Sequence, residues 1–207
     1  MKRLLLAFVI ALCGWNRVAH AADFRFDLVH TQIFFSVSHI GYSQSTGQLH
    51  VKDGYFRFDD DDWSKAQVDA TIDIGSLDMG NAPWSDKLRK AYFDVSTYPT
   101  ARYVSTSVEK TGAKTGIVHG KLTLLGRSQP VDLQLTFNRA GADGYTLRYV
   151  AGFSATAKFR RSAFGMTRSD KDIGDEVTMR IEVEGIRDGD AQKKTQEELQ
   201  SNRPETH

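Results

Sequence analysis

The sequence contains little cysteine, little net charge and only one long apolar run, and each shortage excludes a class of protein. A single cysteine, Cys13, stands among 207 residues, so no disulfide within the chain can hold the fold together. The 27 basic and 26 acidic side chains leave a formal charge of +1, with no basic excess for a nucleic acid partner. The longest apolar run, Leu4 to Cys13, is about half as long as a membrane-spanning helix. We therefore expect a globular protein without an integral membrane segment.

The first 21 residues have the pattern of a signal peptide. Lys2 and Arg3 precede the apolar run, and Ala19-His20-Ala21 supplies the small residues that signal peptidase recognises. The alternative is a buried N-terminal helix. We expect cleavage after Ala21 and export to the periplasm, and Leu12 before Cys13 argues against lipidation. The segment would carry the only cysteine away with it.

From residue 22 to residue 186 the dominant pattern is alternation of apolar and polar residues, which is typical of half-buried strands. Residues 176–184 and 131–138 alternate throughout, and about eight such strands follow one another with short turns between them. Short connections favour an antiparallel sandwich or a closed barrel. A bulge is expected at Asp53-Gly54.

Two segments depart from this alternation. Trp84, Leu88 and Tyr92 recur every fourth residue, which predicts one short helix that covers or plugs an end of the barrel. Residues 187–207 have almost no apolar side chains, so we expect a polar tail that is mobile or loosely helical.

Alternation alone does not say which face points inward. An outer-membrane barrel would turn its apolar face to lipid, but the polar face here carries full charges such as Glu176 and Arg180. We therefore place the apolar residues inside. Small inward residues such as Gly120 and Ala155 leave space, which either neighbouring aromatic rings fill or a ligand occupies. Our hypothesis is an apolar cavity that holds a lipid chain.

The chain resembles the YceI-like family of periplasmic lipid-binding or polyisoprenoid-binding proteins. The resemblance runs in order across nearly all of residues 23–185. Its motifs include Phe35-Ser36-Val37-Ser38-His39, Ser76-Leu77-Asp78-Met79-Gly80, Tyr98-Pro99-Thr100-Ala101-Arg102-Tyr103 and Arg161-Ser162-Ala163-Phe164-Gly165-Met166. It implies a lipocalin-like, eight-stranded antiparallel barrel with a helix beside it and a long apolar cavity. It also implies a ligand of the polyprenyl or isoprenoid-quinone type.

The expected ligand-binding residues face the barrel interior or stand at its mouth. They are Phe35, Val37, His39, Phe56, Phe58, Leu88, Tyr103, Ser105, Leu122, Phe153, Ala155, Phe159 and Arg161. His39 is either a hydrogen-bonded histidine of the interior or rim, or a contact to a ligand head group. Either at least one residue of a basic cluster meets an anionic head group, or the cluster is solvated or paired with acids: Arg160, Arg161, Arg168, Lys87 and Arg89.

No motif for catalysis or metal binding stands out. Ser105 and Ser162 lack a Gly-x-Ser-x-Gly context, and the acidic run Asp59 to Asp62 lacks the ligand spacing of a calcium loop. We therefore expect no cofactor, no metal and no catalytic residue. The favoured function is a periplasmic carrier or store for an amphiphilic, isoprenoid-type lipid. The alternative is a hydrolase or isomerase acting in the same cavity, and a homodimer is left open.

Overall fold

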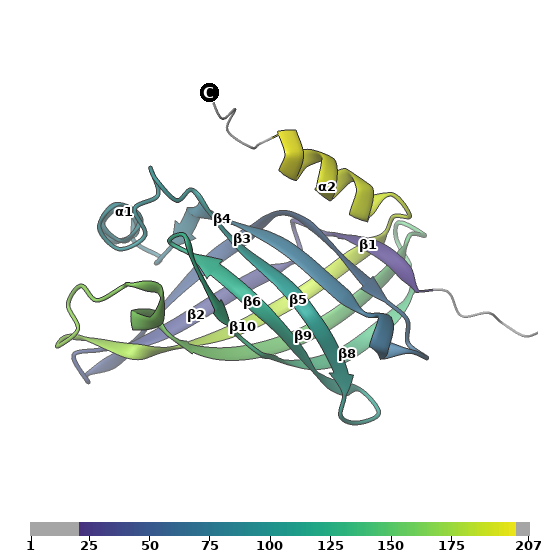
Figure 1. The fold of residues 1–207 in the computed structure, drawn as a ribbon, viewed down its shortest axis with the longest axis horizontal. Coiled ribbons are helices and arrows are strands. Elements are labelled where there is room, and N and C mark those ends of the chain that lie inside the picture. Colours follow the sequence, from purple (N-terminus) through teal and green to yellow (C-terminus); the bar gives the residue numbers. More distant parts are fainter. Residues whose placement is uncertain (1–20, 202–207) are drawn as a thin grey trace, which may run out of the picture.

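The strands of the protein form a closed antiparallel ring. The computed structural model describes residues 21–201, so the expected signal peptide lies outside the described residues except for its last position (Figure 1). The ten strands are β1 (Ala22–Phe26), β2 (Gln32–His39), β3 (Ser43–Phe58), β4 (Gln67–Asp78), β5 (Thr100–Lys110), β6 (Thr115–Leu124), β7 (Arg127–Pro130), β8 (Leu133–Ala142), β9 (Tyr149–Arg160) and β10 (Ile173–Arg187).

These ten strands fill eight positions in the ring. β1 and β2 share one position, because both pair with β10 on one side and with β3 on the other. β7 and β8 share another, because they pair with opposite halves of β6. β9 closes the ring by pairing with β10 from Glu176 opposite Arg160 to Ile186 opposite Val150. The eight-stranded antiparallel barrel is therefore confirmed, and the sandwich is wrong because one continuous ladder runs around the molecule.

The expected bulge is present and lets the long strand β3 bend. The register of β3 against β4 shifts between Val51 and Asp53. Gly54 follows with a φ of +136°, and a Cβ there would collide with the carbonyl oxygen of Asp69. Only glycine fits this position, since it alone lacks the atom that would clash.

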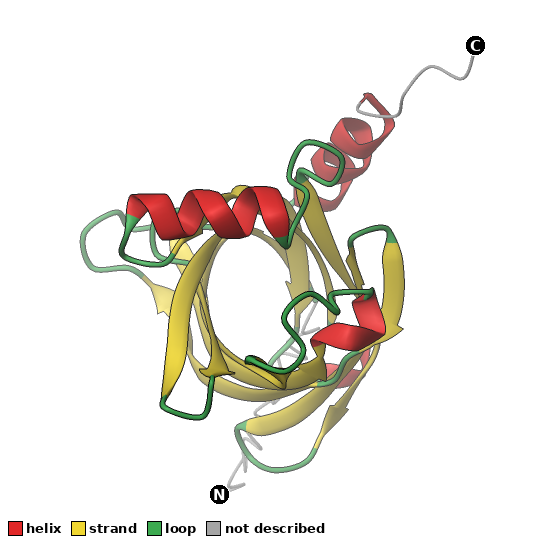
Figure 2. Cartoon of the chain, turned by 90° about the vertical axis from the view of Figure 1, so that its left-hand side faces the viewer, coloured by secondary structure: helices red, strands yellow, loops and turns green. Residues whose placement is uncertain are grey.

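Helix α1 (Ala82–Ala91) lies along one edge of the ring's opening (Figure 2). The short helix at one end of the ring is as predicted, but it lies beside the opening and does not plug it. The side chain of Asn81 caps it by accepting a hydrogen bond from the backbone N–H of Trp84, and Pro83 occupies the first turn. Two short 3₁₀ helices are also present, η1 (Trp63–Lys65) and η2 (Arg161–Phe164), and η2 contacts β7.

The tail contains a second helix that the sequence did not lead us to expect as a fixed element. Helix α2 (Ala191–Ser201) packs on β1 and β3, with Ala191 and Thr195 buried beneath it. The guanidinium of Arg57 donates a hydrogen bond to the Gln192 side chain at 3.0 Å. Of the two alternatives for the tail, mobile or loosely helical, residues 191–201 agree with the helical one. Neither α-helix of the described residues has the length and apolar composition needed to cross a bilayer.

The end of the ring away from α1 is filled by aromatic rings. Phe58 contacts three of them, with centroid distances of 5.4 Å to Trp63, 5.0 Å to Phe137 and 4.8 Å to Phe153. Phe56 stacks on Phe24 with centroids 5.0 Å apart. Such a cluster buries large apolar areas and leaves little space between the rings.

Candidate ligand cavity

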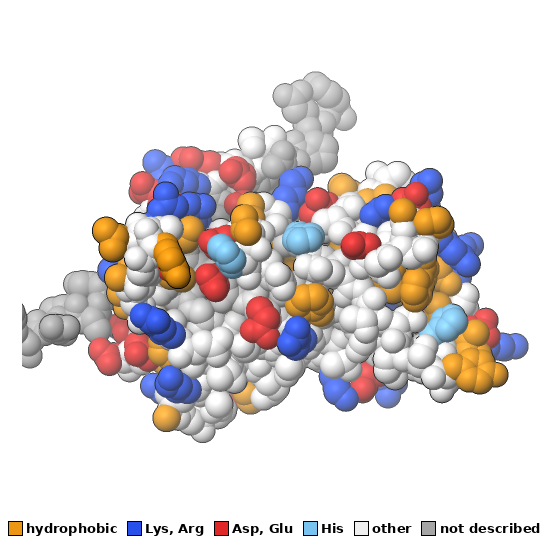
Figure 3. Space-filling view, turned by 180° about the vertical axis from the view of Figure 1, so that it is seen from behind, with side chains coloured by type: hydrophobic (Ala, Val, Ile, Leu, Met, Phe, Trp, Pro, Cys, Tyr) orange, Lys and Arg blue, Asp and Glu red, His pale blue; other side chains and the backbone are white. Residues whose placement is uncertain are grey.

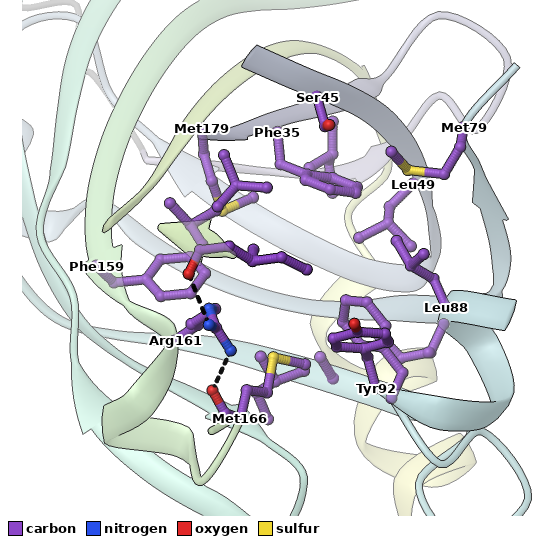
Figure 4. A pocket seen from close by; sticks show the side chains of 18 of the residues that line it. Phe35, Ser45, Leu49, Met79, Leu88, Tyr92, Phe159, Arg161, Met166 and Met179 are labelled. Carbon is purple, nitrogen blue, oxygen red and sulfur yellow. Dashed lines mark hydrogen bonds between the residues drawn. The ribbon is translucent and has the colours of Figure 1, made fainter. Parts of the chain in front are cut away.

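A cavity of about 200 Å³ lies inside the ring next to α1 (Figure 4). Its wall is almost entirely apolar and is contributed by strands from all sides of the ring. Residues from the strands, from α1 and from the loop after η2 point into the same space, including Phe35, Leu49, Leu88, Phe159, Met166 and Met179. An enclosed wall of this kind accepts a hydrocarbon group and offers water few hydrogen-bonding partners.

Seven of the thirteen predicted site residues line this cavity. They are Phe35, Val37, His39, Leu88, Leu122, Phe159 and Arg161. The alternation of apolar residues placed five of them on inward faces, and the four-residue spacing of α1 placed Leu88. The same spacing also carried Trp84 and Tyr92, which line the cavity although they were not among the thirteen.

The methionines of the wall were missed by sequence reasoning. Met79 and Met166 lie outside the regular strands, where no periodicity reveals an inward direction. Met179 lies on β10, and its alternation alone could have identified it. Flexible thioether side chains adapt to ligands of varied shape, so their presence suits a cavity for a chain molecule.

The structure does not bring the other six predicted residues to this cavity. Phe56, Phe58, Phe153 and Ala155 border a separate space of about 80 Å³ at the aromatic end. Tyr103 borders a third space of about 100 Å³. The hydroxyl of Ser105 accepts a hydrogen bond from the backbone N–H of Val68 at 2.9 Å, so this serine stabilises strand β4 beside it. The space beside Tyr103 lies between the other two, because Ile33, Ile72 and Leu122 line both it and the α1-end cavity.

Tyr103 is a structural residue. Its hydroxyl lies 3.1 Å from the carbonyl oxygen of Val118 and 3.0 Å from that of Val131, and donates toward both. Burial raises the pKa of this phenol, because the charged phenolate would lose its hydration. Gly120 makes room for the ring, since a Cβ there would collide with it. The space at Gly120 is therefore filled by a neighbouring aromatic side chain.

Arg161 lines the cavity but has no N–H group left for a ligand. This buried guanidinium donates to five backbone carbonyl oxygens at distances from 2.5 to 3.5 Å, which belong to Met166, Arg168, Ser169, Ile173 and Gly174. A guanidinium has five N–H donors, and all of them are used. The expected contact of Arg161 with an anionic head group is therefore not supported. Its role is to fix the loop between η2 and β10.

Two charged or titratable side chains of the cavity wall are exposed to solvent. His39 is exposed and ends β2, Lys87 lies on α1, and both line the cavity. The hydroxyl of Tyr92 is 3.0 Å from that of Ser169, which connects α1 to the loop after η2. An apolar interior with exposed polar groups in its wall fits an amphiphile whose chain is inside and whose head is outside.

One possible metal-ligand group occurs within residues 21–201, away from the cavity. Ligand atoms of Asp27, His30 and Glu184 lie within 4.8 Å of one another. The Asp27 carboxylate already accepts hydrogen bonds from the backbone of Val29 and His30, and its second oxygen is 3.0 Å from His30 Nδ1. That hydrogen bond raises the pKa of the His30 imidazole. The group shapes the loop between β1 and β2.

A closed ring of eight strand positions with an apolar cavity open at one end defines a barrel of the kind that holds a small ligand inside. A model of the YceI-like domain matches residues 24–185, and the chain belongs to this family. The UPF0312 protein plu2095 of Photorhabdus laumondii is 36% identical over 173 residues, which cover 82% of this chain and 89% of that protein.

Two solved structures share the fold. The crystal structure of Burkholderia cenocepacia BcnA has a TM-score of 0.67 and 24% identity, and covers 77% of this chain and 98% of that one. A polyisoprenoid-binding domain from Saccharophagus degradans, implicated in plant cell wall breakdown, has a TM-score of 0.59 and 15% identity, and covers 82% and 100%.

Proposed function

We propose that the protein binds a long-chain isoprenoid-type lipid, a polyprenyl compound or an isoprenoid quinone, and carries or stores it in the periplasm. The observation that carries the proposal is the apolar cavity between the strands and α1, whose wall includes the exposed side chains of His39 and Lys87. The Saccharophagus domain, which shares the fold and is described as polyisoprenoid-binding, supports this choice of ligand class. The signal-peptide pattern of residues 1–21 supports export.

Affinity in such a site comes mainly from the chain. Each methylene group moved from water into an apolar wall contributes about 0.8 kcal/mol. The thioethers of Met79, Met166 and Met179 adjust to the methyl branches of an isoprenoid. His39 and Lys87, which are exposed and line the cavity, then meet the head group, and Arg161 does not.

We infer that the protein binds its ligand without transforming it, in preference to a hydrolase or isomerase. The titratable side chains of the cavity wall are His39, Lys87, Tyr92 and Arg161. All five N–H groups of Arg161 donate hydrogen bonds to backbone carbonyl oxygens, and the Tyr92 hydroxyl is hydrogen-bonded to that of Ser169. No nucleophile is paired with a base among these lining residues, as nucleophilic catalysis requires.

Native mass spectrometry of the protein, purified without detergent, tests the proposal. We expect an added mass that organic extraction releases as an isoprenoid-type lipid. Val37→Trp should fill the cavity and reduce the bound lipid at least about tenfold, because its side chain lines the wall. Ser36→Trp is the matched control, since the neighbouring side chain on the same strand points to the other face. A repeatedly ligand-free mass, or equal lipid content in both variants, would contradict the proposal.

A further inference from the structure

Large apolar side chains are exposed in two groups at different places on the ring. Ile40, Tyr42 and Trp84 are 51%, 88% and 38% exposed, and they belong to the β2–β3 turn and to α1. The second group lies on the β1–β2 loop, the β8–β9 turn and the start of β9: Leu28, Val29, Tyr145, Leu147 and Tyr149. In Figure 3 hydrophobic side chains are visible at both ends of the molecule, with the β2–β3 turn at the right.

The first group lies next to the cavity, because Trp84 is part of its wall and Ile40 directly follows His39, which lines it. Trp84 is both exposed and part of the cavity wall, so it stands at the rim. The backbone N–H of Ile40 donates to the carbonyl oxygen of Asp172 at 2.5 Å, which connects the β2–β3 turn to the loop after η2. The Tyr92–Ser169 hydrogen bond connects that same loop to α1. We call Ile40, Tyr42 and Trp84 the rim patch.

Ile40 combines a strained backbone with an exposed apolar side chain, as Leu147 also does, but only Ile40 lies beside the cavity. Ile40 has a φ of +53°, a conformation that is strained for a β-branched residue. Half of the side chain is exposed, so packing gives little in return. Asparagine or glycine would suit this backbone better. An apolar side chain kept in such a conformation, at the rim of a cavity, points to a contact outside the protein.

Basic residues stand near the rim patch. Lys87 lies one helical turn after Trp84, and Arg168 and Lys171 lie in the loop that contacts Ile40. The acids of this loop are Asp170 and Asp172. Exposed tryptophan and tyrosine with nearby cations are typical of segments that insert at the boundary between lipid head groups and chains. The balance of charges predicts that anionic lipid strengthens the contact only moderately.

We propose that the rim patch docks the open end of the cavity on a phospholipid bilayer. Ile40, Tyr42 and Trp84 enter the head-group boundary, so that an apolar chain passes between bilayer and cavity without crossing water. The use of this contact for lipid exchange rests on the proposed function. The docking itself does not, since it can be measured with vesicles that contain no isoprenoid.

The chain offers a matched pair of variants. Ile40→Asn with Tyr42→Ser removes a positive-φ aliphatic residue and an exposed tyrosine two positions away. Tyr145→Ser with Leu147→Asn does the same in the β8–β9 turn, where Leu147 has a φ of +58°. None of these four residues lines the cavity next to α1. Asparagine relieves the backbone strain at both turns, so neither variant should fail to fold.

The experiment is vesicle flotation of the protein beginning at Ala22, which contains the whole ring, with phosphatidylcholine vesicles that do or do not include phosphatidylglycerol. We expect the rim variant to bind about tenfold more weakly or worse, and the β8–β9 variant to bind as the unchanged protein does. No binding by the unchanged protein, or equal losses in the two variants, would overturn the proposal. A change from dimer to monomer in the rim variant with unchanged flotation would also overturn it, because the patch would then join two copies of the chain.

A second readout locates the contact. The chain from Ala22 has two tryptophans, Trp84 at the rim and Trp63, which is buried at the aromatic end. Vesicles with brominated acyl chains should quench Trp84 and leave Trp63 bright, and unchanged emission would contradict insertion. Bound lipid in native mass spectra without flotation would refute docking alone, whereas flotation of a protein that never carries lipid would refute the proposed function alone.

Discussion

The two ends of the ring interior use the same kinds of residue and yet differ in what fills them. At the end away from α1, Phe58 lies between Trp63, Phe137 and Phe153, and only small spaces remain. At the α1 end, Phe35 and Phe159 face a cavity of about 200 Å³. The aromatic end therefore stabilises the fold through close packing. The α1 end is packed less closely and leaves space for a ligand. The comparison shows that an inward aromatic residue is by itself no sign of a ligand contact.

The largest effect on the free energy of unfolding is expected from replacing one phenylalanine by alanine at each end of the ring. Phe58→Ala should lower the free energy of unfolding by about 3–5 kcal/mol, because three aromatic neighbours lose their partner and leave a void. Phe35→Ala should cost less, since its ring already borders open space, but it should reduce bound lipid. Urea unfolding together with native mass spectrometry measures both. Equal stability losses, or loss of lipid in the Phe58 variant alone, would contradict the division into two ends.

A smaller effect is expected from the buried arginine of the cavity wall. Arg161→Lys keeps the positive charge but leaves several of the five carbonyl oxygens without a donor, and should cost about 2 kcal/mol. Hydrogen exchange should become faster in residues 165–173 before other parts of the chain. Arg160→Lys on the neighbouring exposed residue is the control. If Arg161 instead served mainly to bind an anionic head group, lipid content would fall and stability would stay the same.

Removing the hydroxyl of Tyr103 tests whether this residue stabilises the fold without contributing to lipid binding. Tyr103→Phe leaves the carbonyl oxygens of Val118 and Val131 without this donor, and should cost about 1 kcal/mol with lipid content unchanged. The effect should also depend on pH. Because burial raises the pKa of the folded phenol, its contribution is complete below the unfolded pKa of 10.0 and is lost as pH rises from there toward the folded value. The phenylalanine variant should lose less stability in that alkaline range, and parallel curves for the two proteins would refute the assignment.

The sequence predicted the ring well and the division of its interior poorly. Strict alternation identified the strands. The spacing of Trp84, Leu88 and Tyr92 identified the helix face that lines the cavity. Alternation reports which face is inward, but it does not report how far along the ring axis a residue lies. Phe35 and Phe58 look equivalent in the sequence for that reason.

The spaces left by small residues were equally ambiguous. The position of Gly120 is filled by Tyr103, and that of Gly185 by Phe56, so these glycines serve packing. The donors of Arg161 are taken by a loop whose shape no periodicity predicts. Such tertiary contacts decide whether an inward position is filled or hollow, and they become visible only when strands distant in sequence are placed side by side.

Removing helix α2 should have the smallest effect on stability. It tests whether contacts on the outside of the ring influence the cavity inside it. The helix packs outside β1 and β3 through Ala191 and Thr195, and Arg57 bonds to Gln192. Ending the chain after Asp190 removes that hydrogen bond and the burial of these two small side chains. The free energy of unfolding should fall by about 1 kcal/mol as a result. Arg57 retains its ion pair with Asp23 at 2.7 Å, so strand β1 should stay in place. Thermal unfolding and native mass spectrometry should therefore show a slightly lower midpoint with the same bound lipid. A large loss of lipid in the shortened protein would mean that α2 controls the cavity from outside the ring, and the binding site could then no longer be assigned to the α1 end alone.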